Sequence, residues 1–289
     1  MSGTKRVLGF LILGSFAAYG QSSLPNLAPF ANATGVLATY NTANGPIDLT
    51  GPFFQSLGTN GRSCASCHRP AQGMGISADE VKARFEFTQG RDPIFRTNDG
   101  SNCDHDIDTS TLAGRRKAYS LLINRGLIRI PLAVPANAEF VVAGVLNPYG
   151  CADPATLSVY RRPLPTTNLR FLSTIMWDGR ESSLQTGTQK ITYLTNPTDL
   201  LANLAHQSVS ATNGHAQAST PLTAEQQQGI VDFEMVLVTA QAYDYRAGAL
   251  NAHGATGGPV NIATQTMPAF YVGINDPLGG NPEGTAFTP

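Results

Sequence analysis

The feature that most constrains this chain of 289 residues is the pentapeptide Cys64-Ala65-Ser66-Cys67-His68. C-x-x-C-H is the attachment sequence of a c-type haem. Two thiols at this spacing reach the two vinyl groups of one porphyrin, and the following imidazole is placed under the iron as an axial ligand. A redox or disulfide Cys-x-x-Cys, or half of a zinc site, is the alternative, although the sequence has no second Cys/His pair at ligand spacing. The motif therefore predicts that Cys64 and Cys67 hold a haem covalently and that His68 is its proximal ligand.

The first 20 residues have the pattern of a secretory signal peptide. Lys5 and Arg6 precede an apolar run at 7–13, and small residues lead to an expected cut after Gly20. The apolar run is too short to span a bilayer, and no later stretch of the sequence approaches that length. A buried N-terminal helix is the alternative. We expect a periplasmic or secreted protein without a membrane span, which agrees with haem attachment on the outer side of the membrane.

Charge and composition limit the partners. Removing Lys5 and Arg6 with the leader leaves 17 of the 19 basic residues against 20 acidic ones, a net charge of −3 with His neutral. This balance indicates neither a nucleic-acid-binding surface nor a polybasic membrane patch. Only 13 % of the residues are charged, whereas 29 are Gly and 19 are Pro, which is typical of a loop-rich protein.

Two helical patterns follow the motif. Ser77 and Glu80 have the spacing of a capping box, which predicts a short helix that ends near Phe87. A second helical pattern runs from 112 to 130 and is interrupted at Gly126. That pattern would place three basic residues on a solvated face: Arg115, Arg116 and Lys117.

The remaining patterns complete the expected fold. Residues 21–50 resemble an extended entry segment, and 141–146 form a β-branched run typical of a strand or extended hairpin arm. An apolar stripe predicts a helix from 198 to 214, and a capping box at Thr223 and Gln226 predicts another that reaches about Tyr245. Helices dominate these patterns, so we expect a mainly α, loop-rich fold.

Two cysteines lie outside the motif. Cys103 and Cys151 are an even remainder, and in an oxidising compartment such a pair is best explained by one disulfide. Two free thiols are the alternative.

A second pair of motifs carries a resemblance. The segment Pro165-Thr166-Thr167-Asn168-Leu169 is followed by Trp177-Asp178-Gly179-Arg180, which holds the single tryptophan of the chain. Together with the upstream Cys-x-Ser-Cys-His, this order of motifs resembles the bacterial di-haem cytochrome c peroxidase superfamily, which includes MauG-like proteins. The resemblance covers roughly residues 50–245, in pieces.

The resemblance implies a domain plan and roles for individual residues. Residues 21–250 would form a cytochrome c-like haem domain with long irregular insertions, the largest at about 88–160, and 251–289 would be a linker or the start of a second haem domain. Cys64, Cys67 and His68 match the attachment site of the peroxide-reacting haem. Trp177 matches the tryptophan that relays electrons between two haems, and Arg180 matches a propionate-binding or structural arginine of the same motif.

Two departures from the family pattern bear on chemistry. The sequence contains one C-x-x-C-H, so it accounts for one haem c, and a second would be expected in a full-length relative. The positions of the glutamine and glutamate that assist O–O cleavage in the family hold Gly187 and Pro197 here. Three neighbouring polar residues are only approximate substitutes: Gln185, Gln189 and Asp199.

The sequence leaves several candidates for the sixth ligand of the iron. Met74 is close in sequence to His68, whereas Met176 is a core candidate. His206 and His215 are the stronger histidine candidates, with His105 and His253 behind them. A sulfur ligand would raise the reduction potential, and an absent ligand would leave the iron open to peroxide.

Three functions are therefore expected for an exported c-type cytochrome of this kind. The first is electron transfer with reduction of hydrogen peroxide, supplied by a small electron-donor protein such as a cytochrome or cupredoxin. The second is electron transfer alone, without a substrate. The third is a MauG-like oxidase that acts on a partner protein. By resemblance alone, a calcium ion could accompany the haem.

Overall fold

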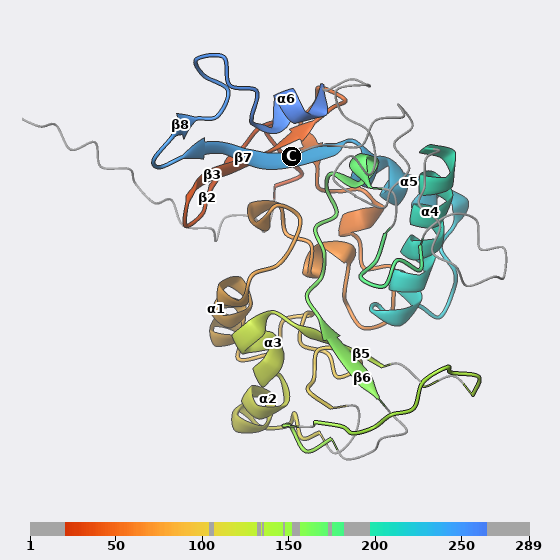
Figure 1. Cartoon of the computed structure of the whole chain (residues 1–289). Coiled ribbons are helices and arrows are strands. Elements are labelled where there is room, and N and C mark those ends of the chain that lie inside the picture. Colours follow the sequence, from red (N-terminus) through yellow and green to blue (C-terminus); the bar gives the residue numbers. More distant parts are fainter. Residues whose placement is uncertain are drawn as a thin grey trace, which may run out of the picture.

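The computed structural model describes residues 21–103, 107–131, 134, 136–146, 148–151, 157–172, 175–181 and 197–264. The expected signal peptide at 1–20 lies outside these residues. Within them, six α-helices and eight strands in three antiparallel sheets are joined by long irregular segments (Figure 1). Our expectation of a mainly α fold is therefore wrong, because the chain is a loop-rich mixture of helices and sheets.

The largest sheet joins segments from the two ends of the described chain. Its strand order is β2-β3-β7-β8, with bounds β2 Pro29–Ala31, β3 Gly35–Asn41, β7 Leu237–Asp244 and β8 Gly248–Ala249. Thr39 on β3 lies opposite Thr239 on β7, 200 residues later, and the two hydroxyl groups are 2.7 Å apart. The α6 helix, Pro259–Ala263, packs against β7 and β3 (Figure 1). The sheet thus depends on long-range pairing and cannot be predicted from any one segment.

Close pairing of β3 with β7 depends on a glycine. A Cβ atom at Gly35 would lie 1.9 Å from the carbonyl oxygen of Tyr243, so a larger residue would push the strands apart. Two smaller sheets pair β1 (Ser23–Leu24) with β4 (Ile47–Asp48), and β5 (Ile128–Pro131) with β6 (Ser158–Arg161).

The helix expected to reach Tyr245 ends at Met235 instead. This helix, α5 (Ala224–Met235), begins at the predicted Thr223 capping box, in which both reciprocal hydrogen bonds form. β7 follows at once, with Leu237 and Val238 at 1 % and 0 % exposed. The β-branched run after Met235 suits a strand, and its pairing with β3 overrides the local helical pattern.

The other predicted helices are present. Ser77 accepts a hydrogen bond from the Glu80 amide and caps α1, Ala78–Thr88. The pattern at 112–130 forms α2 (Leu112–Ala118) and α3 (Ser120–Arg125), and Gly126 ends the helix in the left-handed conformation at φ 64°. Its last three residues, 128–130, are not helical, because they pair with a second segment as a strand. The α4 helix spans Pro197–Gly214.

Two local expectations are wrong. Arg115 is buried rather than solvated, and its guanidinium donates to the carbonyl oxygens of Gln89, Thr109 and Ser110. Buried carbonyl groups need donors, and this arginine supplies them. Residues 141–146 form no strand and lie in an irregular, largely exposed segment.

Three apolar clusters form the core of the described chain. The first lies between α1, α3 and the 92–95 turn and includes Phe85, Phe95 and Leu122. The second includes Phe53, Met74, Ile230 and Leu237. The third packs α4 and α5 against Leu169 and Ile175. None of the helices in the described part of the chain is long and apolar enough to cross a membrane.

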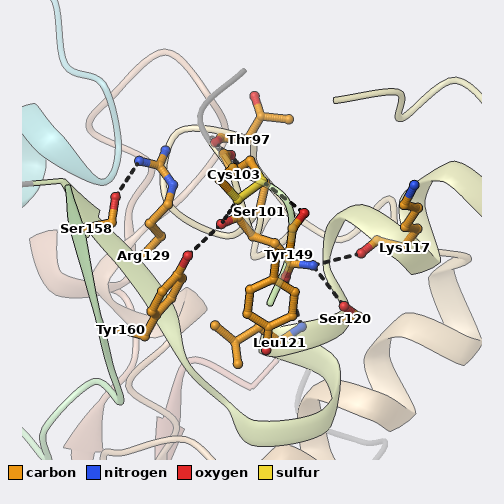
Figure 2. The surroundings of a disulfide bond; sticks show 12 residues. Thr97, Ser101, Cys103, Lys117, Ser120, Leu121, Arg129, Tyr149, Ser158 and Tyr160 are labelled. Atoms are coloured by element: carbon orange, nitrogen blue, oxygen red, sulfur yellow. Dashed lines mark hydrogen bonds between the residues drawn. A yellow bond between two sulfur atoms is a disulfide. The ribbon is translucent and has the colours of Figure 1, made fainter. Parts of the chain in front are cut away.

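The predicted disulfide between Cys103 and Cys151 is confirmed, with the two Cα atoms 5.4 Å apart. Figure 2 shows Tyr149 and Tyr160 beside it, with ring centroids 6.1 Å apart. The backbone carbonyl of Asn102, next to the bridge, accepts a hydrogen bond from the Tyr160 hydroxyl at 2.9 Å. The side-chain amide of Asn102 donates to the Lys117 carbonyl at 3.0 Å. The bridge therefore ties the irregular segment around Cys151 to the α2–α3 junction.

Replacing both bridging cysteines, C103S/C151S, should lower the free energy of unfolding. The two residues are 48 apart in sequence, and the chain-entropy model gives about 4 kcal/mol for closing such a loop. Urea unfolding of the native and double-variant proteins measures the difference. The native protein unfolded with a reductant present should lose a similar amount, and equal stability of the two proteins would show that the bridge contributes nothing.

Candidate functional site

The two cysteines of the C-x-x-C-H motif lie on one tight turn. This turn is η2, Cys64–Ser66, and the amides of Cys67 and His68 donate to the Cys64 carbonyl at 3.1 and 3.0 Å. Ser63 and Ser66 cap it reciprocally. Both thiols are free. The turn thus holds two thiols and the following imidazole at fixed spacing.

The turn is anchored to α1. The Arg84 guanidinium donates to the Ser66 carbonyl at 2.7 Å and forms an ion pair with Asp92 at 2.5 Å. Side chains on both sides of the turn are apolar: Cys64 packs against the cluster that includes Phe53, whereas Cys67 packs against the cluster that includes Phe85. The motif therefore lies at the boundary between two apolar clusters.

Burial keeps both thiols protonated. It raises the pKa of Cys64 to about 12, with a further contribution from the negative charge of Glu234. It also raises the pKa of Cys67. A catalytic redox Cys-x-x-Cys needs a lowered thiol pKa, because the thiolate is its nucleophile. The raised pKa values thus disfavour the thiolate that the redox alternative requires.

His68 is oriented by a backbone carbonyl group. Its Nδ1 lies 3.0 Å from the Met74 carbonyl oxygen. A carbonyl oxygen can only accept, so Nδ1 carries the proton and Nε2 keeps its lone pair. Burial lowers the pKa of His68 to about 4, against the opposing effect of the Met74 and Leu164 carbonyl groups. His68 is thus a neutral imidazole in the tautomer of a metal ligand, with its second nitrogen held as metal-binding histidines require.

An ion-pair network lies beside the turn. Asp99 pairs with the Arg62 guanidinium and accepts a hydrogen bond from His215 Nδ1 at 2.6 Å. Burial acts to raise the pKa of Asp99, but the bond from His215 and the charge of Arg62 outweigh it, so the pKa lies below its usual value. His215 is near enough to His68 for its charge to lower the pKa of His68. The structure thus brings these two histidines into one neighbourhood.

The other sixth-ligand candidates are placed differently. Met74 is 1 % exposed, and its side chain belongs to the apolar cluster around Phe53. Its carbonyl oxygen lies 3.0 Å from Nδ1 of His68. The His206 side chain is 63 % exposed, and its Nδ1 lies 2.8 Å from Glu181. His105 lies outside the described residues, and His253 is exposed.

The Trp-Asp-Gly-Arg motif lies at the surface. Trp177 is 59 % exposed, and its indole N–H donates to the Arg162 carbonyl at 2.9 Å. Arg180 pairs with Asp178 at 3.0 Å. Arg162 is two residues from Leu164, whose carbonyl interacts with His68. Two residues of extended chain span about 7 Å, so Trp177 is tied to the neighbourhood of His68 through this segment.

The positions that replace the family's glutamine and glutamate are less informative. Gln185, Gly187 and Gln189 lie outside the described residues. Pro197 is the first residue of α4, and Asp199 follows in its first turn as a half-buried residue.

Sequence reasoning missed one group at the site. Glu234 is 4 % exposed, and its charge interacts with Cys64. A signal was available, because Glu234 follows the apolar residue Ile230 by four positions and so lies on the same helix face. A carboxyl group on the buried face of an amphipathic helix is unusual, so this position in the sequence indicates a candidate site residue.

No family model matches this chain, and neither a curated protein nor a solved structure does. The resemblance to the di-haem peroxidase superfamily therefore depends on the sequence motifs and stays a prediction. Within the described residues, no three or more His, Cys, Asp and Glu side chains gather into a metal-binding group.

The burial of neutral His68 makes a pH prediction for the chain without a bound group. The pKa of His68 is about 4 in the folded chain against 6.5 for the free residue. Between these values the unfolded chain binds more protons, so the free energy of unfolding rises with pH and reaches its full value above about 6.5. Urea unfolding of the native protein and H68Q at several pH values measures this slope.

The H68Q variant should lose this part of the slope. H253Q is the matched control, because His253 is exposed, and it should behave as the native protein does. The same slope in H68Q and the native protein would contradict the assignment.

Proposed function

We propose that this chain is an exported c-type cytochrome that carries one covalent haem and transfers electrons. The observation that carries the proposal is the C-x-x-C-H turn with its imidazole already in the metal-binding tautomer. Cys64 and Cys67 would form the thioether bonds, and His68 would ligate the iron through Nε2. When bound, the haem supplies a one-electron couple at the iron.

The surroundings of the turn fit a porphyrin. Cys64 and Cys67 contact two different apolar clusters, so a flat apolar group attached to both thiols would meet hydrophobic side chains. The Phe53 ring lies 6.2 Å from the His68 ring and packs on Phe233 at 4.7 Å. The Met74 carbonyl fixes the direction of Nε2. These residues would orient the group and exclude water from it.

The remaining cysteines support the proposed location. The Cys103–Cys151 disulfide is typical of proteins outside the cytoplasm. The signal-peptide pattern at 1–20 points to the same compartment. A periplasmic or secreted position is therefore part of the proposal.

Reduction of hydrogen peroxide is a second candidate function, and the placement of Met74 favours it. The Met74 carbonyl holds Nδ1 of His68, and the Met74 side chain is packed in the core. This arrangement favours packing over iron ligation for Met74. Without a methionine sulfur, the sixth position is either open or filled by another group such as His215.

Trp177 and Arg180 fit a surface role in this function. The indole is exposed and bonded to the segment that reaches His68. A small electron-donor protein, such as a cytochrome or cupredoxin, would approach this face and deliver electrons through Trp177. Arg180 and Asp178 form a charged pair beside it.

Loss of either motif cysteine should weaken or abolish covalent haem. C64A and C67A proteins, expressed with the haem-attachment machinery, are denatured, separated by electrophoresis and stained for haem. The C103S/C151S protein is the matched control, because it loses cysteines outside the motif and should stain normally. Normal staining of both C64A and C67A would refute the attachment site.

The visible spectrum separates the two candidate functions. A high-spin ferric spectrum that changes on adding hydrogen peroxide is expected if the sixth position is open, and it would support peroxide reduction. A low-spin spectrum that is indifferent to peroxide would restrict the function to electron transfer. If His215 fills the sixth position, H215A should convert a low-spin spectrum to a high-spin one.

A further inference from the structure

One carboxyl group is buried beside the C-x-x-C-H turn without a role in haem attachment. Glu234 lies in the last turn of α5, is 4 % exposed, and its Oε2 has no hydrogen-bond partner among the described residues. Burying a charge without a partner is costly, so a buried carboxyl group of this kind calls for an explanation.

The geometry of α5 directs Glu234 toward the turn. Ile230 lies one helical turn earlier on the same face and is buried in the cluster against which Cys64 packs. The adjacent Phe233 packs on Phe53, which in turn faces the His68 ring. The charge of Glu234 also acts on the Cys64 thiol. The carboxyl group is therefore within electrostatic reach of a porphyrin held by Cys64.

No charge within the described residues compensates Glu234. The elements packed against α5 are α4, η1 (Pro52–Phe54) and η5 (Leu169–Phe171). α4 carries Asp199 and His206, η5 carries Arg170, and η1 carries no titratable group. Burial raises the pKa of Glu234 to about 8, and none of these neighbours contributes to the shift. Cys64 becomes an uncharged thioether on haem attachment, so the haem would then be the one charged neighbour among the described surroundings.

We propose that Glu234 takes up one proton when one electron enters the haem, so that reduction and protonation are coupled. The inference rests on the proposed function, because it requires a haem on Cys64 and Cys67. An external donor protein supplies the electron, and a buffer acid in the solvent gives up the proton. An O–H bond forms at the Glu234 carboxylate, and the net charge of the buried site is unchanged.

The physical cause is the low dielectric around the site. An added electron raises the energy of a nearby carboxylate far more in a dry interior than in water. The pKa of Glu234 is therefore higher in the reduced protein than in the oxidised one. Between the two pKa values, reduction is accompanied by proton uptake, and the reduction potential falls as the pH rises.

The test is the midpoint potential of the haem-loaded full chain between about pH 6 and 10. For the native protein we expect a fall that begins near pH 8. Complete coupling corresponds to about 59 mV for each tenfold change in proton concentration. E234Q keeps the shape of the side chain but cannot ionise, so its potential should not fall in this window. E225Q makes the same change at an exposed position of the same helix and should behave as the native protein does.

Several outcomes would overturn the inference. The inference alone fails if haem is bound but the potential of the native protein is flat, or if E234Q keeps the native slope. Absence of covalent haem from the native protein overturns the proposed function and the inference with it. If E234Q does not retain haem, the native protein labelled with ¹³C-glutamate decides by its redox-difference infrared spectrum at about pH 9. A labelled carboxylic-acid band that grows on reduction supports the proposal, and its absence overturns it.

Discussion

The pairing of β3 with β7 is the contact on which the site depends. It brings residue 39 against residue 239, and α5, which leads directly into β7, packs against η1 and shares with it the apolar cluster that Cys64 contacts. The same strand holds the segment after Leu164: the Asn168 amide donates to the Leu237 carbonyl at 3.0 Å, and its side chain exchanges two bonds with Thr239. Thr166 then donates to the Met74 carbonyl. One strand thus positions groups on two sides of His68.

Burial gives the site a consistent electrostatic character. Cys64, Cys67 and His68 all favour their neutral forms, for the same physical reason that raises the pKa of Glu234. The nearby charges are paired with one another, as Arg62 is with Asp99. A cofactor placed here would meet few mobile counter-charges. Changes in its own charge would therefore be felt strongly by whichever titratable group lies closest.

The sequence was sufficient for what depends on neighbouring residues. The caps at Ser77 and Thr223, the stop at Gly126 and the disulfide of Cys103 follow from local chemistry or from cysteine arithmetic, and the structure confirms them. The spacing of the motif also predicts the turn that places His68 after two thiols. The residues near Met74 in the sequence, however, do not predict that its carbonyl group contacts the His68 imidazole.

What failed depends on distant partners. The run after Met235 continues a helical pattern, and only β3 makes it a strand. The polar neighbours of Arg115 in the sequence predict an exposed side chain. In the structure Arg115 is buried and donates hydrogen bonds to three carbonyl groups. Glu234 became a site residue through the packing of α5, which no local pattern specifies. The residues of a motif can be recognised from a short stretch of sequence, whereas the packing around them depends on segments that are distant in the sequence.

The raised thiol pKa values have a consequence for maturation. If the chain is exported and carries the proposed haem, Cys103 and Cys151 must be oxidised while Cys64 and Cys67 stay reduced. Disulfide exchange proceeds through thiolates, and a thiol with a pKa of about 12 forms very few of them at neutral pH. Wherever the fold forms early, it shields the motif from the oxidant that completes the bridge. The packing of Cys64 and Cys67 against apolar clusters therefore separates them chemically from Cys103 and Cys151, which form the disulfide.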